Sequence, residues 1–221
     1  LANFIEDAND EKPTFPFLCL TVSGGHTQIV KINNYFEMEI LGETIDDAAG
    51  EAFDKAGKIL NLPYPAGPII DKKSKIGDPT KFKFAKPKIE GLNFSFSGFK
   101  TSILYFIQKE VKANPNFIEE NIDDLCASIQ YSIVNILMEK VKKASDETGI
   151  KQIAIAGGVS ANSEIRQRLK DGETEFGWKT FIPKFAYTTD NAAMIAMVGS
   201  LKFDQELFTK NTAKSVAKYH I

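Results

Sequence analysis

Two glycine-rich turns, far apart in the chain, have the residue types that can bind an anion. Residues 23–27 read Ser-Gly-Gly-His-Thr, residues 157–162 read Gly-Gly-Val-Ser-Ala-Asn, and each segment follows a short apolar run. Because glycine has no Cβ, backbone N–H groups in such turns can approach a phosphate closely, and a helix after the second turn would add its N-terminal N–H groups. The pair predicts a nucleotide-binding cleft with side-chain donors from Ser23, His26 and Thr27, although Gly-Gly after a strand is also typical of a simple tight turn.

Carboxylates form a second group of candidates. A helix predicted over residues 43–60 would place Asp47, Glu51 and Asp54 on one face, at positions i, i+4 and i+7. Such a stripe is either a solvated surface or a ligand site. Like charges at this spacing repel, and Gly50 weakens the same helix, so stability alone does not explain the pattern. Gly50 would permit close approach of a ligand or of another backbone segment.

Asp190 stands directly before the apolar run that begins at Ala192. Aspartate in this position is typical of a helix N-cap, and it could also be a metal ligand held at a helix start. The only histidines are His26 and His220, so no HxxxH or HExxH zinc motif exists in the chain. No Ser-His-Asp arrangement is suggested by the spacing either.

The elements that must position these residues alternate between strand and helix. Hydrophobic periodicity predicts strands over 17–23, 27–33, 36–42, 152–156 and 179–183. It predicts helices over 43–60, from about 69, and over 100–111, 122–148, 162–169 and 190–204, with an extended, irregular segment over 78–96.

This order indicates an α/β fold of the ribonuclease-H-like type found in actin, sugar kinases and Hsp70. We expect residues 1–16 to be the end of a helix and a linker, 17–204 the lobe itself with a helical insertion at about 50–145, and 205–221 a C-terminal tail. The first residue is Leu1, so we expect a C-terminal piece of a longer protein whose first lobe is missing.

Composition narrows the class of protein. The 27 basic residues nearly balance the 29 acidic ones, so no global field favours nucleic acid or membrane. The lysine-rich segment 81–88 is the best local candidate for RNA contact, or else a solvated strand with Phe82 and Phe84 inside. Cys19 and Cys126 lie in apolar runs without CxxC spacing, which indicates reduced core residues of a cytoplasmic protein.

Six motifs in order resemble the signatures of the TsaD/Gcp family. They are SGGHTQ at 23–28, DDAAGEAFDK at 46–55, YPAGP at 64–68, FSFSGFKT at 94–101, AGGVSAN at 156–162 and TDNAAMIA at 189–196. The resemblance implies an ASKHA fold and tRNA N6-adenosine threonylcarbamoyltransferase activity, which uses threonylcarbamoyl-AMP to modify the adenosine beside the anticodon (t6A formation).

The resemblance also implies roles for individual residues. Substrate-binding positions would be Thr21, Val22, Ser23, Gly24, Gly25, Asp54, Gly67, Asp71 and Asn162, with Asp71 reaching the ribose hydroxyls and Asn162 on the adenosine side. Asp190 would be one ligand of a divalent metal, iron or zinc, which moves our interpretation of this residue from cap to ligand. The family's HxxxH ligands would lie just before Leu1, so we expect the 221 residues alone to be inactive and to bind metal and nucleotide weakly.

Partners implied by the family are tRNA, a paralogous inactive ASKHA subunit and a small P-loop ATPase, with no membrane. Two alternatives remain: a nucleotide-binding, non-catalytic ASKHA scaffold subunit, and the metallo-glycoprotease activity once assigned to the family. A sugar or acetate kinase of the same superfamily is disfavoured by the six motifs.

Overall fold

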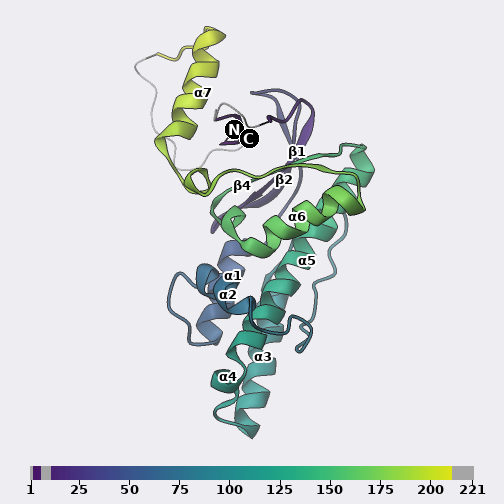
Figure 1. The fold of residues 1–221 in the computed structure, drawn as a ribbon, viewed down its shortest axis with the longest axis vertical. Coiled ribbons are helices and arrows are strands. Elements are labelled where there is room, and N and C mark those ends of the chain that lie inside the picture. The colour runs from purple at the N-terminus through teal and green to yellow at the C-terminus, as the bar shows by residue number, and fades with distance from the viewer. Residues whose placement is uncertain (1, 6–10, 211–221) are drawn as a thin grey trace.

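A mixed β-sheet forms the upper half of the molecule (Figure 1). The computed structural model describes residues 2–5 and 11–210. Within them the strands lie in the order β3-β2-β1-β4-β5, where β1 to β3 are antiparallel and β4 and β5 run parallel to β1. Along the chain, three strands precede a helical segment and two further strands, each followed by a helix, as predicted for the ribonuclease-H-like lobe. The bounds are Phe17–Val22 (β1), Thr27–Ile32 (β2), Met38–Glu43 (β3), Gln152–Ala156 (β4) and Lys179–Phe181 (β5).

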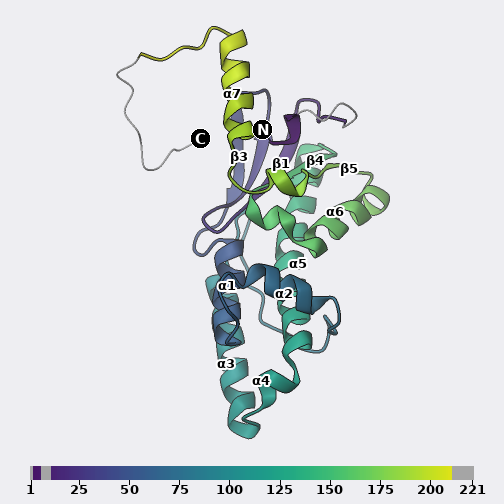
Figure 2. The ribbon, with the colours of Figure 1, turned by 60° about the vertical axis from the view of Figure 1, so that its left-hand side comes forward.

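Most of the helices form a long body below the sheet, and one projects above it (Figures 1 and 2). Helices α1 to α5 lie between β3 and β4 in the chain, α6 follows β4, and α7 projects from the far end of the sheet. Their bounds are Ala49–Ile59 (α1), Gly67–Ser74 (α2), Ser97–Ala113 (α3), Phe117–Glu120 (α4), Ile122–Thr148 (α5), Ser163–Glu175 (α6) and Ala192–Asp204 (α7).

Successive side chains of a strand point to opposite faces of the sheet, and a hydrophobic core lies on each face. Leu18, Leu20 and Val22 of β1 pack with the helices in the main core. Phe17, on the opposite face, packs with Phe4 in a smaller core.

Helix α5 is the centre of the main core, as its periodicity predicts. All six of the apolar residues that define its predicted face are buried, namely Leu125, Ile129, Ile133, Ile136, Leu137 and Val141. Gly149 ends the helix in the left-handed conformation, with φ of 72°. Cys126 is buried in this helix, where loss of hydration raises the pKa of its thiol to about 12. The interpretation of Cys126 as a buried core residue is therefore confirmed, whereas Cys19 is only partly buried.

The predicted start of the first helix is wrong. α1 begins at Ala49 rather than Glu43, because Thr44 still follows the sheet: its N–H donates to Thr27 O (2.9 Å), and it forms a β-bridge with Phe94. The Thr27 hydroxyl then accepts from Ala49 N at 2.8 Å. A side chain from β2 thus satisfies the start of α1, a contact that local sequence does not reveal.

Other boundaries shift by a few residues. α3 begins at Ser97 rather than Lys100, α6 continues to Glu175 rather than Leu169, and β5 ends at Phe181. At the N-terminus, Ala2–Phe4 form a short 3-10 turn. The tail expected over 205–221 lies outside the described residues from 211 onward.

Residues 78–96 are irregular, as predicted, and they are held against α5. Phe82 packs against Phe106 and Phe117, while Lys81 pairs with Asp124 at 2.6 Å and Lys86 pairs with Glu139. Phenylalanines inside and paired lysines outside favour the structural interpretation of this segment over RNA contact.

Candidate functional site

The two glycine-rich turns meet at one cavity, which we call the central cavity. Its volume is about 290 Å³, and it lies where the ends of β1 and β4 face α1 and α2. The turn after β1, helix α1, helix α2 with the loop before it, and the turn after β4 all contribute lining residues. These are Gly24, Gly50, Phe53, Asp54, Pro65, Gly67, Pro68, Asp71, Gly158, Val159, Ala161 and Asn162. A cleft at the carboxyl ends of neighbouring parallel strands is the usual ligand position in α/β sheets.

Five predicted binding residues line this cavity: Gly24, Asp54, Gly67, Asp71 and Asn162. Thr21, Val22, Ser23 and Gly25 do not. Thr21 and Val22 belong to β1, and Val22 is fully buried, so these two residues support the turn from behind.

Two of the three expected side-chain donors of the first turn, Ser23 and Thr27, use their hydroxyl oxygens as acceptors within the fold, and the third, His26, is exposed. The Ser23 hydroxyl accepts from the N–H groups of Gly25 (3.2 Å) and His26 (2.9 Å), which folds the turn on itself. The Thr27 hydroxyl is engaged at the start of α1. Gly24 N–H makes no hydrogen bond within the described part of the chain, so the backbone of this turn has one N–H group available to an anion.

The glycines around the cavity fall into two groups, those required by close backbone packing and those that face open space. A Cβ on Gly50 would lie 2.7 Å from Ser23 O, and one on Gly157, which has φ of 92°, would lie 2.3 Å from Val22 O. Both are required by close backbone packing, which confirms that Gly50 permits the approach of another backbone segment. A Cβ on Gly24 would meet nothing within 4 Å, and one on Gly158 would meet only a methyl group at 3.9 Å. Those two face open space in the cavity.

The N-terminus of α6 is already occupied by side chains. Asn162 caps it by accepting from Ile165 N at 3.1 Å, and its amide donates to Gln130 Oε1 at 2.7 Å. Asp71 Oδ1 accepts from both the N–H (3.0 Å) and the hydroxyl (2.8 Å) of Ser163. The expectation that this helix end would offer free N–H groups to a phosphate is therefore wrong for Ser163 and Ile165, because Asp71 of α2 accepts from the first and Asn162 from the second.

The predicted acidic stripe does not form. Asp47 lies before α1, so it shares no helical face with Glu51 and Asp54. Lys55 Nζ joins Asp47 (2.7 Å) to Glu51 (2.8 Å), and these contacts raise the pKa of Lys55. Asp54 faces the cavity and accepts from Ala66 N at 2.8 Å, which fixes the loop between α1 and α2.

Asp190 is exposed, and it is not the cap of α7. Asn191 takes that position by accepting from Met194 N at 3.0 Å. Among residues 2–5 and 11–210, no group of three or more His, Cys, Asp or Glu side chains is placed to hold a metal ion. These residues alone do not fit the metal that the family resemblance implies.

Asp46 is a residue that the sequence reasoning missed. Its carboxylate accepts from the hydroxyl of Ser95 (2.5 Å) and from the N–H (3.3 Å) and hydroxyl (2.7 Å) of Ser97, and also from Phe96 N (2.7 Å). Burial acts to raise the pKa of Asp46, but these hydrogen bonds outweigh it and hold the pKa below its ordinary value. Asp46 thus caps α3 from a distance. The alternating serines of the FSFSG motif are the signal that could have suggested a carboxylate partner.

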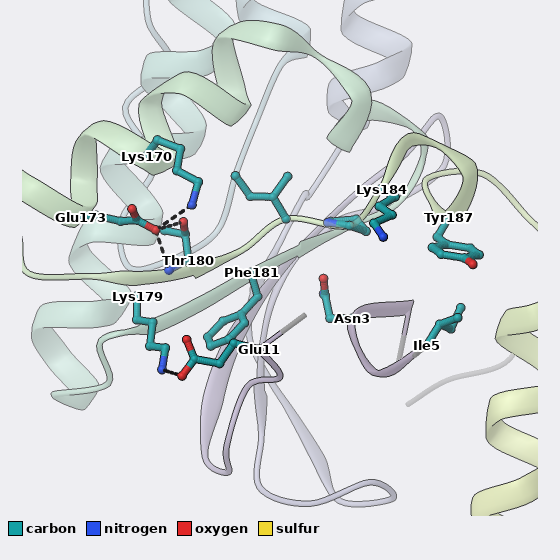
Figure 3. Close-up of a pocket in the computed structure, with 12 residues that line it drawn as sticks. Asn3, Ile5, Glu11, Lys170, Glu173, Lys179, Thr180, Phe181, Lys184 and Tyr187 are labelled. Atoms are coloured by element: carbon teal, nitrogen blue, oxygen red, sulfur yellow. Dashed lines mark hydrogen bonds and ion pairs between the residues drawn. The ribbon is translucent and has the colours of Figure 1, made fainter. Parts of the chain in front are cut away.

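A further cavity, of about 390 Å³, lies beside β5 (Figure 3). Its charged side chains are largely paired with one another: Glu173 contacts Lys170 (3.0 Å) and Thr180, and Lys179 contacts Glu11. None of the predicted site residues lines it. Within residues 2–5 and 11–210, no helix is both long and apolar enough to cross a membrane.

Comparison with known proteins gives one family. The family model described as TsaD, tRNA N6-adenosine threonylcarbamoyltransferase, matches residues 1–197. A protein of that name from Riemerella anatipestifer is 64% identical over 221 residues, covering 100% of this chain and 65% of its own length. Another, from Christiangramia forsetii, is 63% identical over 219 residues, covering 99% of this chain and 64% of its own length.

Solved structures with a similar fold have little sequence in common with the chain. A full-length HypF in its phosphate- and nucleotide-bound form matches with a TM-score of 0.63 at 10% identity, over 94% of this chain and 42% of HypF. HypF of T. kodakarensis matches with a TM-score of 0.61 at 14% identity, over 92% of this chain and 36% of that protein. At these identities the likeness shows the fold alone, and it agrees with an ASKHA-like lobe.

Proposed function

The chain belongs to the TsaD family, and from that premise we propose that it forms part of the site that transfers a threonylcarbamoyl group to tRNA. The acceptor is N6 of the adenosine beside the anticodon, and the donor is threonylcarbamoyl-AMP. The chain spans 65% of the length of the Riemerella relative, so the complete reaction is proposed for the full-length protein.

One observation supports this proposal most strongly. Residues from four of the six family motifs, which are spread over more than a hundred positions of the sequence, line the single central cavity. Its volume of about 290 Å³ is near the lower end of the range for small-molecule sites. We propose that it holds the adenylate portion of the donor.

Charge favours one orientation of the adenylate. Gly24 and Gly158 offer bare backbone to the phosphate, as close approach requires. Asp54 and Asp71 would repel a phosphate and can accept hydrogen bonds from ribose hydroxyls. Asn162 has both side-chain groups engaged, so we propose that it positions the adenosine side of the cavity through the α6 cap.

The reaction itself is acyl transfer to an amine. The N6 nitrogen forms a bond to the carbamoyl carbon, the bond from that carbon to the phosphate oxygen breaks, and AMP leaves with the electron pair. N6 loses one proton in the process. The contribution we assign to this chain is binding and orientation of the adenylate, which lowers the barrier by holding the carbonyl in position for attack.

We propose that Asp190 contributes one carboxylate to a divalent iron or zinc site. Because the described residues supply no further ligands around it, we derive no step through the metal. A paralogous inactive subunit and a small P-loop ATPase stay proposed partners, and the cytoplasm is the compartment in which we place the reaction.

Transfer of threonylcarbamoyl from its adenylate to unmodified tRNA tests this function. The assay uses the full-length protein together with its partners, and compares it with the Asp190→Ala variant of the same length. We expect modified adenosine with the parent protein and none with the variant. Because Asp190 is exposed and makes no cap, the variant should keep the thermal unfolding of the parent.

Two other outcomes would replace the proposal. A folded parent that binds the adenylate without modifying tRNA would indicate the non-catalytic scaffold subunit. Cleavage of a glycoprotein substrate by the same preparation, without transfer, would indicate the protease activity once assigned to the family.

A further inference from the structure

We propose that a second cavity, next to the central one, binds an unstacked nucleotide of the acceptor RNA. We call it the outer cavity. Tyr64 would stack on the base and Lys58 would face the phosphate. This inference rests on the proposed function, because it assigns to that function a place for its second substrate.

The outer cavity borders the central cavity. Its volume is about 560 Å³, and its lining residues are Gly24, Glu51, Asp54, Lys55, Lys58, Leu62, Pro63, Tyr64 and Ala66. Gly24 and Asp54 line both cavities. A nucleotide in the outer cavity would therefore be separated from a donor in the central cavity only by these two residues.

The shape of the outer cavity follows from a close reversal of the chain after α1. A Cβ on Gly57 would lie 2.1 Å from Ala66 Cβ, so only glycine lets the following loop fold back on the helix. Leu62 N donates to Gly57 O at 2.9 Å, and Ala66 N donates to Asp54 at 2.8 Å. The loop that presents Tyr64 is thus fixed to α1 at both of its ends.

Lys58 is the cation that remains available in this cavity. Lys55 is engaged by Asp47 and Glu51, which also neutralises Glu51. The side chain of Lys58 is exposed and has no ion pair or hydrogen bond within the described part of the chain. One free cation at the wall suits a single phosphate of an RNA strand, and it is too little for an acidic peptide with several charges.

Tyr64 provides an uncovered aromatic face. Its side chain is 85% exposed, although it stands in a loop whose neighbours Leu62 and Ala66 are packed. An aromatic residue beside a cation is the pattern with which proteins bind unpaired nucleotides, since every base has a face that can stack. Anticodon-loop nucleotides are unpaired, which makes them accessible to such a site.

Binding of an anticodon stem-loop RNA tests the proposal. The experiment uses the full-length protein and four of its variants, Tyr64→Ala, Tyr64→Phe, Lys58→Ala and Lys58→Arg. Tyr64→Ala should weaken RNA binding by about tenfold or more, and Tyr64→Phe should restore it. Lys58→Ala should lower the slope of log affinity against log salt by about 0.7, the value for one contact with a single strand, and Lys58→Arg should preserve that slope.

Control variants and measurements of AMP binding separate this inference from the proposed function. Tyr105→Ala and Lys112→Ala change exposed residues of α3 outside both cavities and should leave RNA binding unchanged. All variants should bind AMP as the parent does, and free AMP should not displace the RNA. Unchanged RNA affinity in Tyr64→Ala and Lys58→Ala would overturn the inference even if the parent modifies tRNA. Failure of the parent to modify tRNA, with Tyr64-dependent RNA binding intact, would overturn the reaction instead.

Discussion

At Gly50, the first turn of α1 comes so close to the loop after β1 that no side chain fits between them. Gly50 N donates to Ser23 O at 3.1 Å, and this contact fixes the first glycine-rich turn against the helix. Gly24, one residue beyond Ser23, has open space around it. Neighbouring glycines thus serve different purposes, one for packing and one for access to a ligand.

Gly50→Ala should therefore destabilise the protein, whereas Gly24→Ala should not. The new methyl group at position 50 would overlap Ser23 O and Gly24 N, and we expect a loss of about 1–3 kcal/mol in the free energy of unfolding. Urea unfolding of the two variants measures the difference. Equal stability of both variants would contradict the close approach at Gly50.

Asp71 should act mainly through its hydrogen bonds to Ser163. Asp71→Ala removes the acceptor for two donors at the start of α6, and we expect a loss of about 1–2 kcal/mol in the free energy of unfolding. Asp71→Asn keeps an oxygen acceptor and should recover most of this loss. If thermal unfolding showed no difference between the two variants, the carboxylate would have no role at this helix end.

At the scale of elements, the start of α3 depends on a residue about fifty positions earlier. Asp46 takes the place of a local cap, and its pKa is held below the ordinary value by four hydrogen bonds that outweigh the effect of burial. The stabilisation by Asp46 is therefore present above the unfolded-state pKa of about 3.9, and it is lost as pH falls through the lower, folded-state pKa.

Asp46→Ala should accordingly be less stable than the parent near neutral pH, by about 0.5–2 kcal/mol, as for the loss of a helix cap. The difference between the two proteins should shrink as the pH falls below about 4, where this carboxylate is protonated in the unfolded parent before it is in the folded one. Urea unfolding at a series of pH values measures this. A difference that stays constant down to pH 2 would mean that the ionised carboxylate is not what stabilises α3.

Elements whose signals are local were predictable from the sequence, and elements that depend on distant partners were not. The length of α5 and the strands β1, β2 and β4 follow from periodicity and from glycine at the ends. The start of α1 at Ala49 depends on Thr27 in β2, and that of α3 depends on Asp46. The second of two adjacent polar residues, Asn191, caps α7, and sequence alone does not distinguish it from Asp190.

At the scale of the molecule, α7 is an apolar helix that the rest of the described structure covers only in part, where Met197 packs against the smaller core. None of its residues is buried, and Ile195 and Phe203 are 75% and 68% exposed. Both figures show it projecting beyond the sheet (Figures 1 and 2). Exposed apolar surface of this kind favours association between molecules.

Replacing Ile195 and Phe203 with lysine should therefore reduce association of the 221-residue chain without unfolding it. We expect a change of no more than about 0.5 kcal/mol in stability, because neither side chain packs in a core. Sedimentation velocity at several concentrations, with thermal unfolding alongside, measures both effects. A large fall in the melting temperature would contradict the exposed position of these two side chains.

The candidate site was partly predictable at this scale. The two glycine-rich turns indicate a shared cleft, and the family resemblance added Asp54, Gly67 and Asp71 to it. The sequence could not show that Asp71 accepts hydrogen bonds from Ser163, nor that the Thr27 hydroxyl accepts one from Ala49 N at the start of α1. Those contacts join segments that only the folded chain brings together.

Binding of a hydrolysis-resistant threonylcarbamoyl-AMP analogue tests the central claim, that the central cavity is the adenylate site. Titration calorimetry would compare the affinity of the full-length protein for the analogue with that of its Gly24→Ala/Gly158→Ala double variant. Both new methyl groups would enter open space, so stability should be unchanged while affinity falls by tenfold or more, about 1.4 kcal/mol. One bound ligand per parent molecule and this loss in the variant are the predicted result. Equal affinity of the two proteins for the analogue would contradict the account.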